Sequence, residues 1–331
     1  MTDLATVSRQ QGNCLIYVHG RDFKPPAQRL LDFIVAALAA AIERDRPEVL
    51  DRFYSLDKRL CYYGDHTNAF LTTISRHYDE SLDIGDRRNA LLKLKSLVKT
   101  KHFGVTRYDR LPGKTAMAEF AADVAAPLLG TIGLSKALIT KVARDLAQYW
   151  KADGEFAAKL RDRVRPAIME ALDREDRVLL VSHGTGSIVT YDVLWQLSHD
   201  PEYKDRYAEK KIDTWLTLGA PLGDSMVRRR LLGAKSKGRE RFPINVMTWQ
   251  NISAEDDYFC HDNTLADDYK AMLKQRQVSS IRDFRIYNLA IRYGKSNPHS
   301  SVGYLMHPRT AQIVADWIAN QPDAPLATNI F

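Results

Sequence analysis

Residues 178–189 read VLLVSHGTGSIV, and this stretch decides the fold. The four aliphatic residues Val178–Val181 predict a buried strand, and the residues Ile188–Ser198 predict a helix. Between them lies a tight turn that contains glycine. A buried strand that passes through such a turn into a helix is the building unit of a sheet covered by helices. We therefore expect an α/β protein.

Short apolar runs of the same kind occur along the rest of the chain, separated by helical stretches. Helices are predicted over Pro26–Arg46 and Pro308–Ala319, and the second begins with proline at its first position. Because helices separate the strands, we expect a mostly parallel sheet of about six or more strands with helices on both faces. The five further runs predicted as strands are Cys14–Val18, Arg59–Tyr63, Thr214–Leu218, Ile244–Ile252 and Phe284–Leu289.

Residues 79–174 interrupt this rhythm and are expected to form a helical insertion in a single domain that spans residues 1–331. Asp79–Lys114 is polar and basic, Thr115–Trp150 is apolar and helical, and Glu155–Arg174 is an amphipathic helix. Such an insertion forms a cap or lid in some folds and additional scaffold in others. Both alternatives stay open; the lid alternative predicts two helices in residues 115–150, broken near Gly130.

Length and composition exclude several classes of protein. The chain has 331 residues, of which 45% are hydrophobic and 27% charged, which excludes a disordered or fibrous protein. Its longest apolar run, Phe33–Ile42, is half of the roughly 20 residues that span a membrane. The first residues show no secretory pattern, and the three scattered cysteines favour neither zinc nor disulfides. We expect a cytoplasmic protein with no metal and no cofactor.

Positive charge gathers in one segment, Arg228–Arg241, which reads RRRLLGAKSKGRER. The net charge of the chain is +7, which favours association with anionic partners but says nothing about the fold. We expect a solvated loop and helix end here, and the open alternative is contact with an anionic membrane or with nucleic acid. No nucleic-acid-binding module accompanies the segment, so the nucleic-acid alternative is the less favoured.

The turn SHGTG at residues 182–186 resembles the nucleophile elbow, G-x-S-x-G, of the α/β-hydrolase superfamily, in particular its lipase- and esterase-like branch. Ser182 and Gly186 stand at the flanking places, which must be small because neighbouring backbones approach closely. His183 stands before the nucleophile place, and Gly184 occupies that place instead of serine. A phosphate-binding turn is the alternative, but the chain has neither GxGxxG nor GxxxxGK(S/T).

The resemblance also implies an acid and a histidine, which follow the nucleophile in this order along the chain. Asp257, with Asp256 as runner-up, lies after the fifth predicted strand, where the family has its acid. His299 lies in the loop before the last helix, where the family has its general base. His261 and His307 are the other candidates, and His307 looks more like the start of a helix.

The first predicted strand ends in a His-Gly pair that resembles the oxyanion loop of the family. By this resemblance the oxyanion donors are the backbone amides of Arg21 and Thr185. The turn 219–221 after the fourth strand is similar to the small-residue turn beside the active site. The residues expected to contact a substrate are His19, Gly20, His183 and Leu222.

Glycine at position 184 cannot form a covalent acyl-enzyme. Three explanations stay open: an inactivated esterase, a natural pseudoenzyme that binds acyl or lipid ligands, and an enzyme in which His299 with Asp257 activates a water. The resemblance therefore implies a carboxylic ester hydrolase family member, lipid esters included, with weak or absent activity. The alternatives are a non-catalytic binding or regulatory protein and an interaction protein that uses its basic segment. The expected partner is a small-molecule ester or acyl ligand, and the sequence does not indicate an oligomeric state.

Overall fold

The computed structural model describes residues 12–74, 76–113, 144–151, 154–260 and 264–320. Six strands form one parallel sheet in the order β2-β1-β3-β4-β5-β6, which confirms the predicted α/β class and parallel sheet. Their bounds are β1 Asn13–Val18, β2 Asp57–Cys61, β3 Arg177–His183, β4 Ile212–Leu218, β5 Val246–Ala254 and β6 Ser280–Ile286. A two-stranded hairpin follows, formed by β7 (Ile291–Arg292) and β8 (Lys295–Ser296).

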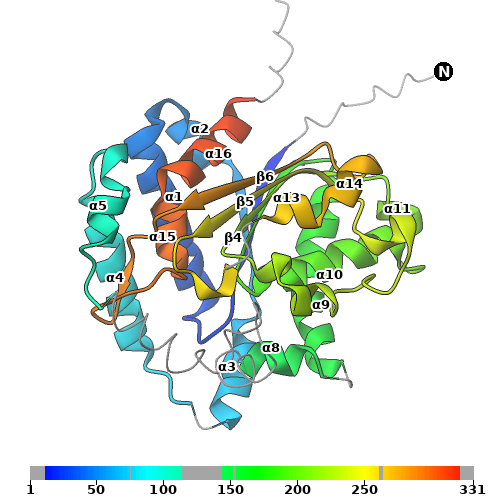
Figure 1. The fold of residues 1–331 in the computed structure, drawn as a ribbon, viewed down its shortest axis with the longest axis horizontal. Coiled ribbons are helices and arrows are strands. Elements are labelled where there is room, and N and C mark those ends of the chain that lie inside the picture. The colour runs from blue at the N-terminus through cyan, green and yellow to red at the C-terminus, as the bar shows by residue number, and fades with distance from the viewer. Residues whose placement is uncertain (1–11, 75, 114–143, 152–153, 261–263, 321–331) are drawn as a thin grey trace, which may run out of the picture.

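Helices cover both faces of the sheet (Figure 1). On one face lie α1 (Ala27–Asp45), α4 (Glu80–Lys95), α15 (Ser301–Met306) and α16 (Pro308–Ala319), and on the other α9 (Glu155–Asp173) and α10 (Gly186–His199). The shorter α-helices are α2 Leu50–Ser55, α3 Gly64–Thr73, α5 Val105–Tyr108, α8 Arg144–Tyr149, α11 Lys204–Tyr207, α12 Ser225–Arg228, α13 Leu265–Asp268 and α14 Lys270–Lys274. The 3₁₀ turns are η1 Pro47–Val49, η2 Thr100–His102, η3 Pro221–Gly223, η4 Gly238–Arg241 and η5 Tyr258–Cys260. In the part of the chain that the structure describes, every helix is too short or too polar to cross a membrane.

Alternate residues of each central strand enter different hydrophobic cores. Val178 and Leu180 of β3 face the core beneath α9 and α10, whereas Leu179 and Val181 face the core beneath α1 and α16. All four side chains are fully buried. Because both faces of a parallel sheet are covered, its strands are continuous apolar runs, which explains why VLLV is a reliable strand signal.

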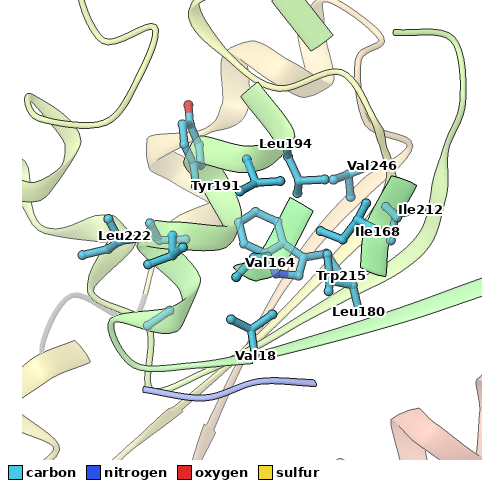
Figure 2. Packing of buried hydrophobic residues seen from close by; sticks show 14 of the residues in the cluster. Val18, Val164, Ile168, Leu180, Tyr191, Leu194, Ile212, Trp215, Leu222 and Val246 are labelled. Atoms are coloured by element: carbon cyan, nitrogen blue, oxygen red, sulfur yellow. The ribbon is translucent and has the colours of Figure 1, made fainter. Parts of the chain in front are cut away.

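The core beneath α9 and α10 is built around Trp215 of β4, as Figure 2 shows. Val164 and Ile168 of α9 and Leu194 of α10 lie around its indole ring. The ring stacks on Trp249 of β5, with 4.5 Å between the centroids. This packing fixes β3, β4 and α10 relative to one another, and these are the elements that carry the turn at Gly184.

The two edge strands begin earlier than the sequence predicts. β2 begins at Asp57 rather than Arg59, and β6 begins at Ser280 rather than Phe284. Both strands are partly exposed along their length and carry charged side chains. Charged residues are common on edge strands, so an apolar run marks only the better buried end of each.

The described parts of residues 79–174 pack as scaffold on both faces of the sheet. Helix α4 contacts α1 and α15, and helix α9 contacts α10 and the strands β1 and β2. From the predicted lid at residues 115–150, the structure describes α8, which contacts α3 and α9. Residues 114–143, with Gly130, lie outside the described residues, so the lid stays a prediction.

The turn after β3 lies directly against the chain segment that follows β1. A Cβ atom added to Gly186 would lie 2.3 Å from the carbonyl oxygen of His19, and one added to Gly20 would lie 2.9 Å from that of His183. Real Cβ atoms do not approach an oxygen this closely, and a backbone atom cannot rotate away. Glycine at both positions therefore lets the two segments meet.

We expect Gly186→Ala to destabilise the protein by about 1–3 kcal/mol, because the added methyl group overpacks against the backbone. Urea denaturation followed by circular dichroism measures the free energy of unfolding. The matched control is Gly85→Ala in α4, where an added Cβ would meet no atom within 4 Å. The free energy of unfolding of that control should rise by about 0.5–1 kcal/mol, because alanine is more stable than glycine inside a helix. Equal stability of Gly186→Ala and the parent would contradict the close approach.

Candidate active site

Gly184 occupies the tip of the turn between β3 and α10. Its φ angle is +53°, in the left-handed region that favours glycine, and its amide donates to the carbonyl of Leu218 at 2.9 Å. A Cβ atom added here would lie 2.9 Å from Nε2 of His299 and 3.1 Å from its Cε1. A side chain at position 184 would therefore point at the His299 ring, which is the group the sequence predicts as its base.

The carboxylate of Asp257 holds the ring of His299 through a hydrogen bond to Nδ1. Nδ1 of His299 lies 3.0 Å from Oδ1 and 2.9 Å from Oδ2 of this carboxylate. A carboxylate can only accept, so Nδ1 carries the proton and donates it to this hydrogen bond. In the neutral ring Nε2 then bears the lone pair, and it is buried without a hydrogen-bond partner among the described residues. The lone pair is thus directed at the position of the missing side chain.

The carboxylate of Asp257 is fully buried and accepts two further hydrogen bonds. The hydroxyl of Tyr304 donates to Oδ2 at 2.6 Å, and the amide of Phe259 donates to Oδ1 at 3.0 Å. Burial alone would raise the pKa of Asp257, but the charge of His299 and these hydrogen bonds outweigh it and lower the pKa. Gly219, with φ +58°, allows this crowding, since a Cβ there would lie 2.9 Å from Oδ2. The acid therefore remains ionised beside the histidine.

The competing acid and histidines lie elsewhere in the fold. Asp256 is exposed and accepts a hydrogen bond from the hydroxyl of Tyr108 at 2.8 Å. His307 caps α16 by accepting from the amide of Arg309 at 3.0 Å, and burial lowers its pKa to about 3. His261 lies outside the described residues. Among the described candidates, only Asp257 and His299 meet each other at the turn.

His183 supports the loop that carries His299. Its Nε2 lies 3.0 Å from the backbone carbonyl of His299, and the two rings lie 4.7 Å apart. Since a carbonyl only accepts, Nε2 of His183 carries the proton. Burial, followed by the charge of His299, lowers the pKa of His183 well below its usual value, so the ring stays neutral. His183 lines the cavity described below, and its donor nitrogen is occupied in positioning His299.

His19 fixes the backbone of the predicted oxyanion loop. Its Nε2 accepts from the amide of Tyr63 at 3.1 Å, so its Nδ1 is protonated and donates to the carbonyl of Gly20 at 2.8 Å. Burial lowers the pKa of His19 to about 3, so this pattern persists at neutral pH. Because the Gly20–Arg21 peptide is trans, the Arg21 amide points away from the His19 ring. The second predicted donor, the amide of Thr185, lies at the N-terminus of α10.

The hydroxyl groups nearest the turn do not face His299. Ser182 and Ser187 are fully buried, and their hydroxyl groups form a hydrogen bond with each other, with 2.9 Å between the oxygens. Ser182 also accepts from the indole of Trp215 at 2.9 Å. Thr185 lines a small cavity of about 10 Å³ between α8 and α10, on which His299 does not border. None of these three hydroxyl groups therefore replaces the missing one.

A cavity of about 460 Å³ opens beside His299. Three of the residues expected to contact a substrate, His19, Gly20 and His183, line it, and so does Arg21, the expected oxyanion donor. Leu222 requires a correction, because its side chain is fully buried in the core beneath α10 and does not border this cavity (Figure 2). The sequence did not single out the polar groups that form the rest of the wall, among them Lys24 and Arg87. These groups come from distant segments, and no local pattern links them.

One cluster of metal-type ligands lies at the opposite edge of the sheet. It consists of Cys14, Asp57 and Asp176, and burial raises the pKa of Cys14 to about 12. Asp57 and Asp176 already pair with Arg174 at 2.8 and 2.9 Å. A protonated thiol and two neutralised carboxylates form a poor cation site.

Part of the basic segment Arg228–Arg241 contacts the protein itself. Arg228 pairs with Asp268 at 2.8 Å, and the guanidinium of Arg230 lies 5.2 Å from the ring centroid of Trp150. The side chains of Arg228 and Arg230 are therefore less available for contact with an anionic surface. Contact between this segment and an anionic membrane stays a prediction.

We expect Asp257→Asn to lower the free energy of unfolding by about 1–3 kcal/mol at pH 7, because it removes a hydrogen-bonded buried charge. A depressed carboxyl pKa contributes stability above the pKa of the unfolded chain, about 4, and loses it as the pH falls through the folded pKa. The difference between parent and variant should therefore shrink below about pH 4. Urea denaturation at several pH values measures it.

The matched control is Asp256→Asn, which changes the same charge one residue earlier, on an exposed side chain. Asparagine keeps an acceptor oxygen for the Tyr108 hydroxyl, so this variant should lose less stability than Asp257→Asn at pH 7. A pH-independent difference between Asp257→Asn and the parent would contradict an ionised buried acid.

The chain matches no protein-family model, no curated protein and no solved structure. Its function is therefore inferred from the positions of Gly184, His299 and Asp257 and from the cavity beside them.

Proposed function

We propose that the chain has the α/β-hydrolase fold and that its site is that of a carboxylic ester hydrolase whose nucleophile position is Gly184. One observation carries this proposal: the unpartnered Nε2 of His299 lies where a side chain on Gly184 would point. The left-handed φ angle of Gly184 and the strand–turn–helix around it support the same assignment.

The other groups then have defined roles. Asp257 keeps the Nδ1–H tautomer of His299 and stabilises the imidazolium that forms when Nε2 takes a proton. The amides of Arg21 and Thr185 stabilise the oxyanion of the tetrahedral intermediate. His19 and His183 are positioning residues, because they hold the oxyanion loop and the His299 loop by hydrogen bonds to backbone carbonyls.

With glycine at the tip, a side-chain nucleophile is missing from this arrangement. A water that reached Nε2 of His299 could attack an activated ester directly. We expect this route to be slow or undetectable, since no covalent intermediate divides the barrier. The buried, mutually bonded Ser182 and Ser187 favour the alternative function, a non-catalytic binding or regulatory protein on the same fold.

We expect Gly184→Ser to raise the hydrolysis of 4-nitrophenyl acetate by about 10²-fold or more, because a triad acts as a unit and gains most from its last member. The serine Cβ would displace the His299 ring by a few tenths of an ångström, and the left-handed backbone adds strain. The variant should therefore lose about 1–3 kcal/mol of stability. Release of nitrophenolate measures the rate, and urea denaturation measures the stability.

The control is the double variant Gly184→Ser with His299→Ala, which should fall back to the rate of the parent. A second control, Gly85→Ser, adds the same hydroxyl at an exposed position of α4 and should gain nothing. If Gly184→Ser folds and shows no gain, the hydrolase assignment fails and the binding protein becomes the better interpretation.

A further inference from the structure

The cavity beside His299 is lined by more positive than negative side chains. Its wall includes one lysine and four arginines, which face three aspartates: Arg21, Lys24, Arg76, Arg87, Arg292, Asp22, Asp79 and Asp83. Long acyl chains bind in sites lined mainly by hydrophobic side chains. This wall therefore favours a polar ligand over the lipid ester that the sequence leaves open.

Arg87 of α4 is the group that points most clearly to a ligand. It is 7% exposed and its Nε donates to Asp83 at 2.8 Å, whereas its two terminal amino groups donate to no residue in the described parts of the chain. The same Asp83 carboxylate also accepts from Arg292 at 2.7 Å. Arg292 also pairs with Asp86, so the two guanidinium groups face two carboxylates. The terminal amino groups of Arg87 nevertheless keep unused donors beside the cavity.

Lys24 adds a second buried positive charge to the same wall. Its ammonium group donates to the backbone carbonyls of Arg21, Asp22 and Phe23, and no carboxylate among the described residues pairs with it. Burial lowers the pKa of Lys24 to about 7, and the charge of Arg87 is the next largest cause. The carboxylates of Asp22, Asp145 and Asp83 favour the charged form of Lys24 in part. An anion bound near Lys24 and Arg87 would stabilise the charges of both further.

We propose that this cavity binds an anionic oxygen group, a carboxylate or a phosphate, on the terminal amino groups of Arg87 with the charge of Lys24 beside it. Guanidinium groups bind both anions through paired N–H donors. Binding itself does not require catalysis, but the assignment of this anion to an ester substrate rests on the proposed function. The substrate class is then an ester that also carries an acidic group.

Isothermal titration of the full chain with inorganic phosphate and with monomethyl succinate tests binding at constant ionic strength. We expect at least one of the two anions to bind and neutral dimethyl succinate not to bind. The anion that binds more tightly indicates whether the site prefers a phosphate or a carboxylate. Arg87→Gln should raise the dissociation constant about 10-fold or more, the usual effect of losing a charged hydrogen bond. The matched control Arg88→Gln removes the same charge from an exposed position of α4 and should change nothing.

The proposal is overturned if neither anion binds the parent, or if Arg87→Gln binds as tightly as the parent does. Should Arg87→Gln fail to fold, Arg87→Lys replaces it. That variant keeps the charge and a donor for Asp83 but lacks the terminal amino groups, and it should also weaken binding.

A kinetic experiment separates this inference from the proposed function. In the Gly184→Ser background, mono-4-nitrophenyl succinate should exceed 4-nitrophenyl butyrate in kcat/KM by about 10-fold or more, and Arg87→Gln should abolish the preference. If neither ester is hydrolysed while anions still bind, the hydrolase assignment fails and the anion site stands. If the neutral ester is hydrolysed as well as the anionic one and no anion binds, the anion site fails and the hydrolase assignment stands.

Discussion

The left-handed turn at Gly184 is the constraint on which the rest of the site depends. It turns the chain from β3 into α10 within a few residues and presents its tip to Nε2 of His299. The turn is possible because Gly20 and Gly186 let two backbone segments touch. The stacked Trp215 and Trp249 rings hold the strands behind it in place. A rigid scaffold thus supports a backbone conformation that side chains rarely adopt.

Several buried polar groups around this turn have hydrogen-bond partners among the described residues. Asp257 accepts from His299, Tyr304 and Phe259, and the neutral rings of His19 and His183 bond to backbone carbonyls. The lone pair on Nε2 of His299, in contrast, has no partner among the described residues. Leaving such a group unpaired costs free energy in a folded protein. A hydrogen bond from a ligand, a water or a side-chain hydroxyl to this atom would remove that cost.

The sequence predicts the parallel sheet because the sheet depends on local signals, whereas the order of the candidate residues came from the resemblance to the α/β-hydrolase superfamily. Short apolar runs mark the central strands, and the carboxyl ends of parallel strands meet at one edge, where Gly184, Asp257 and His299 follow their strands. Tyr304 and Arg87 carry no such signal, since their partners lie on distant segments. Leu222 was expected to contact a substrate, but its side chain is fully buried in the core beneath α10.

If His299 faces position 184 as a general base faces its nucleophile, a serine placed there should be reactive. Reaction with a fluorophosphonate, followed by mass spectrometry of the digested protein, measures this reactivity. We expect Gly184→Ser to form one stoichiometric adduct at position 184. The parent chain and the double variant Gly184→Ser with His299→Ala should remain unmodified at that position. A folded Gly184→Ser variant that forms no adduct, or one that reacts equally well without His299, would contradict this role of His299.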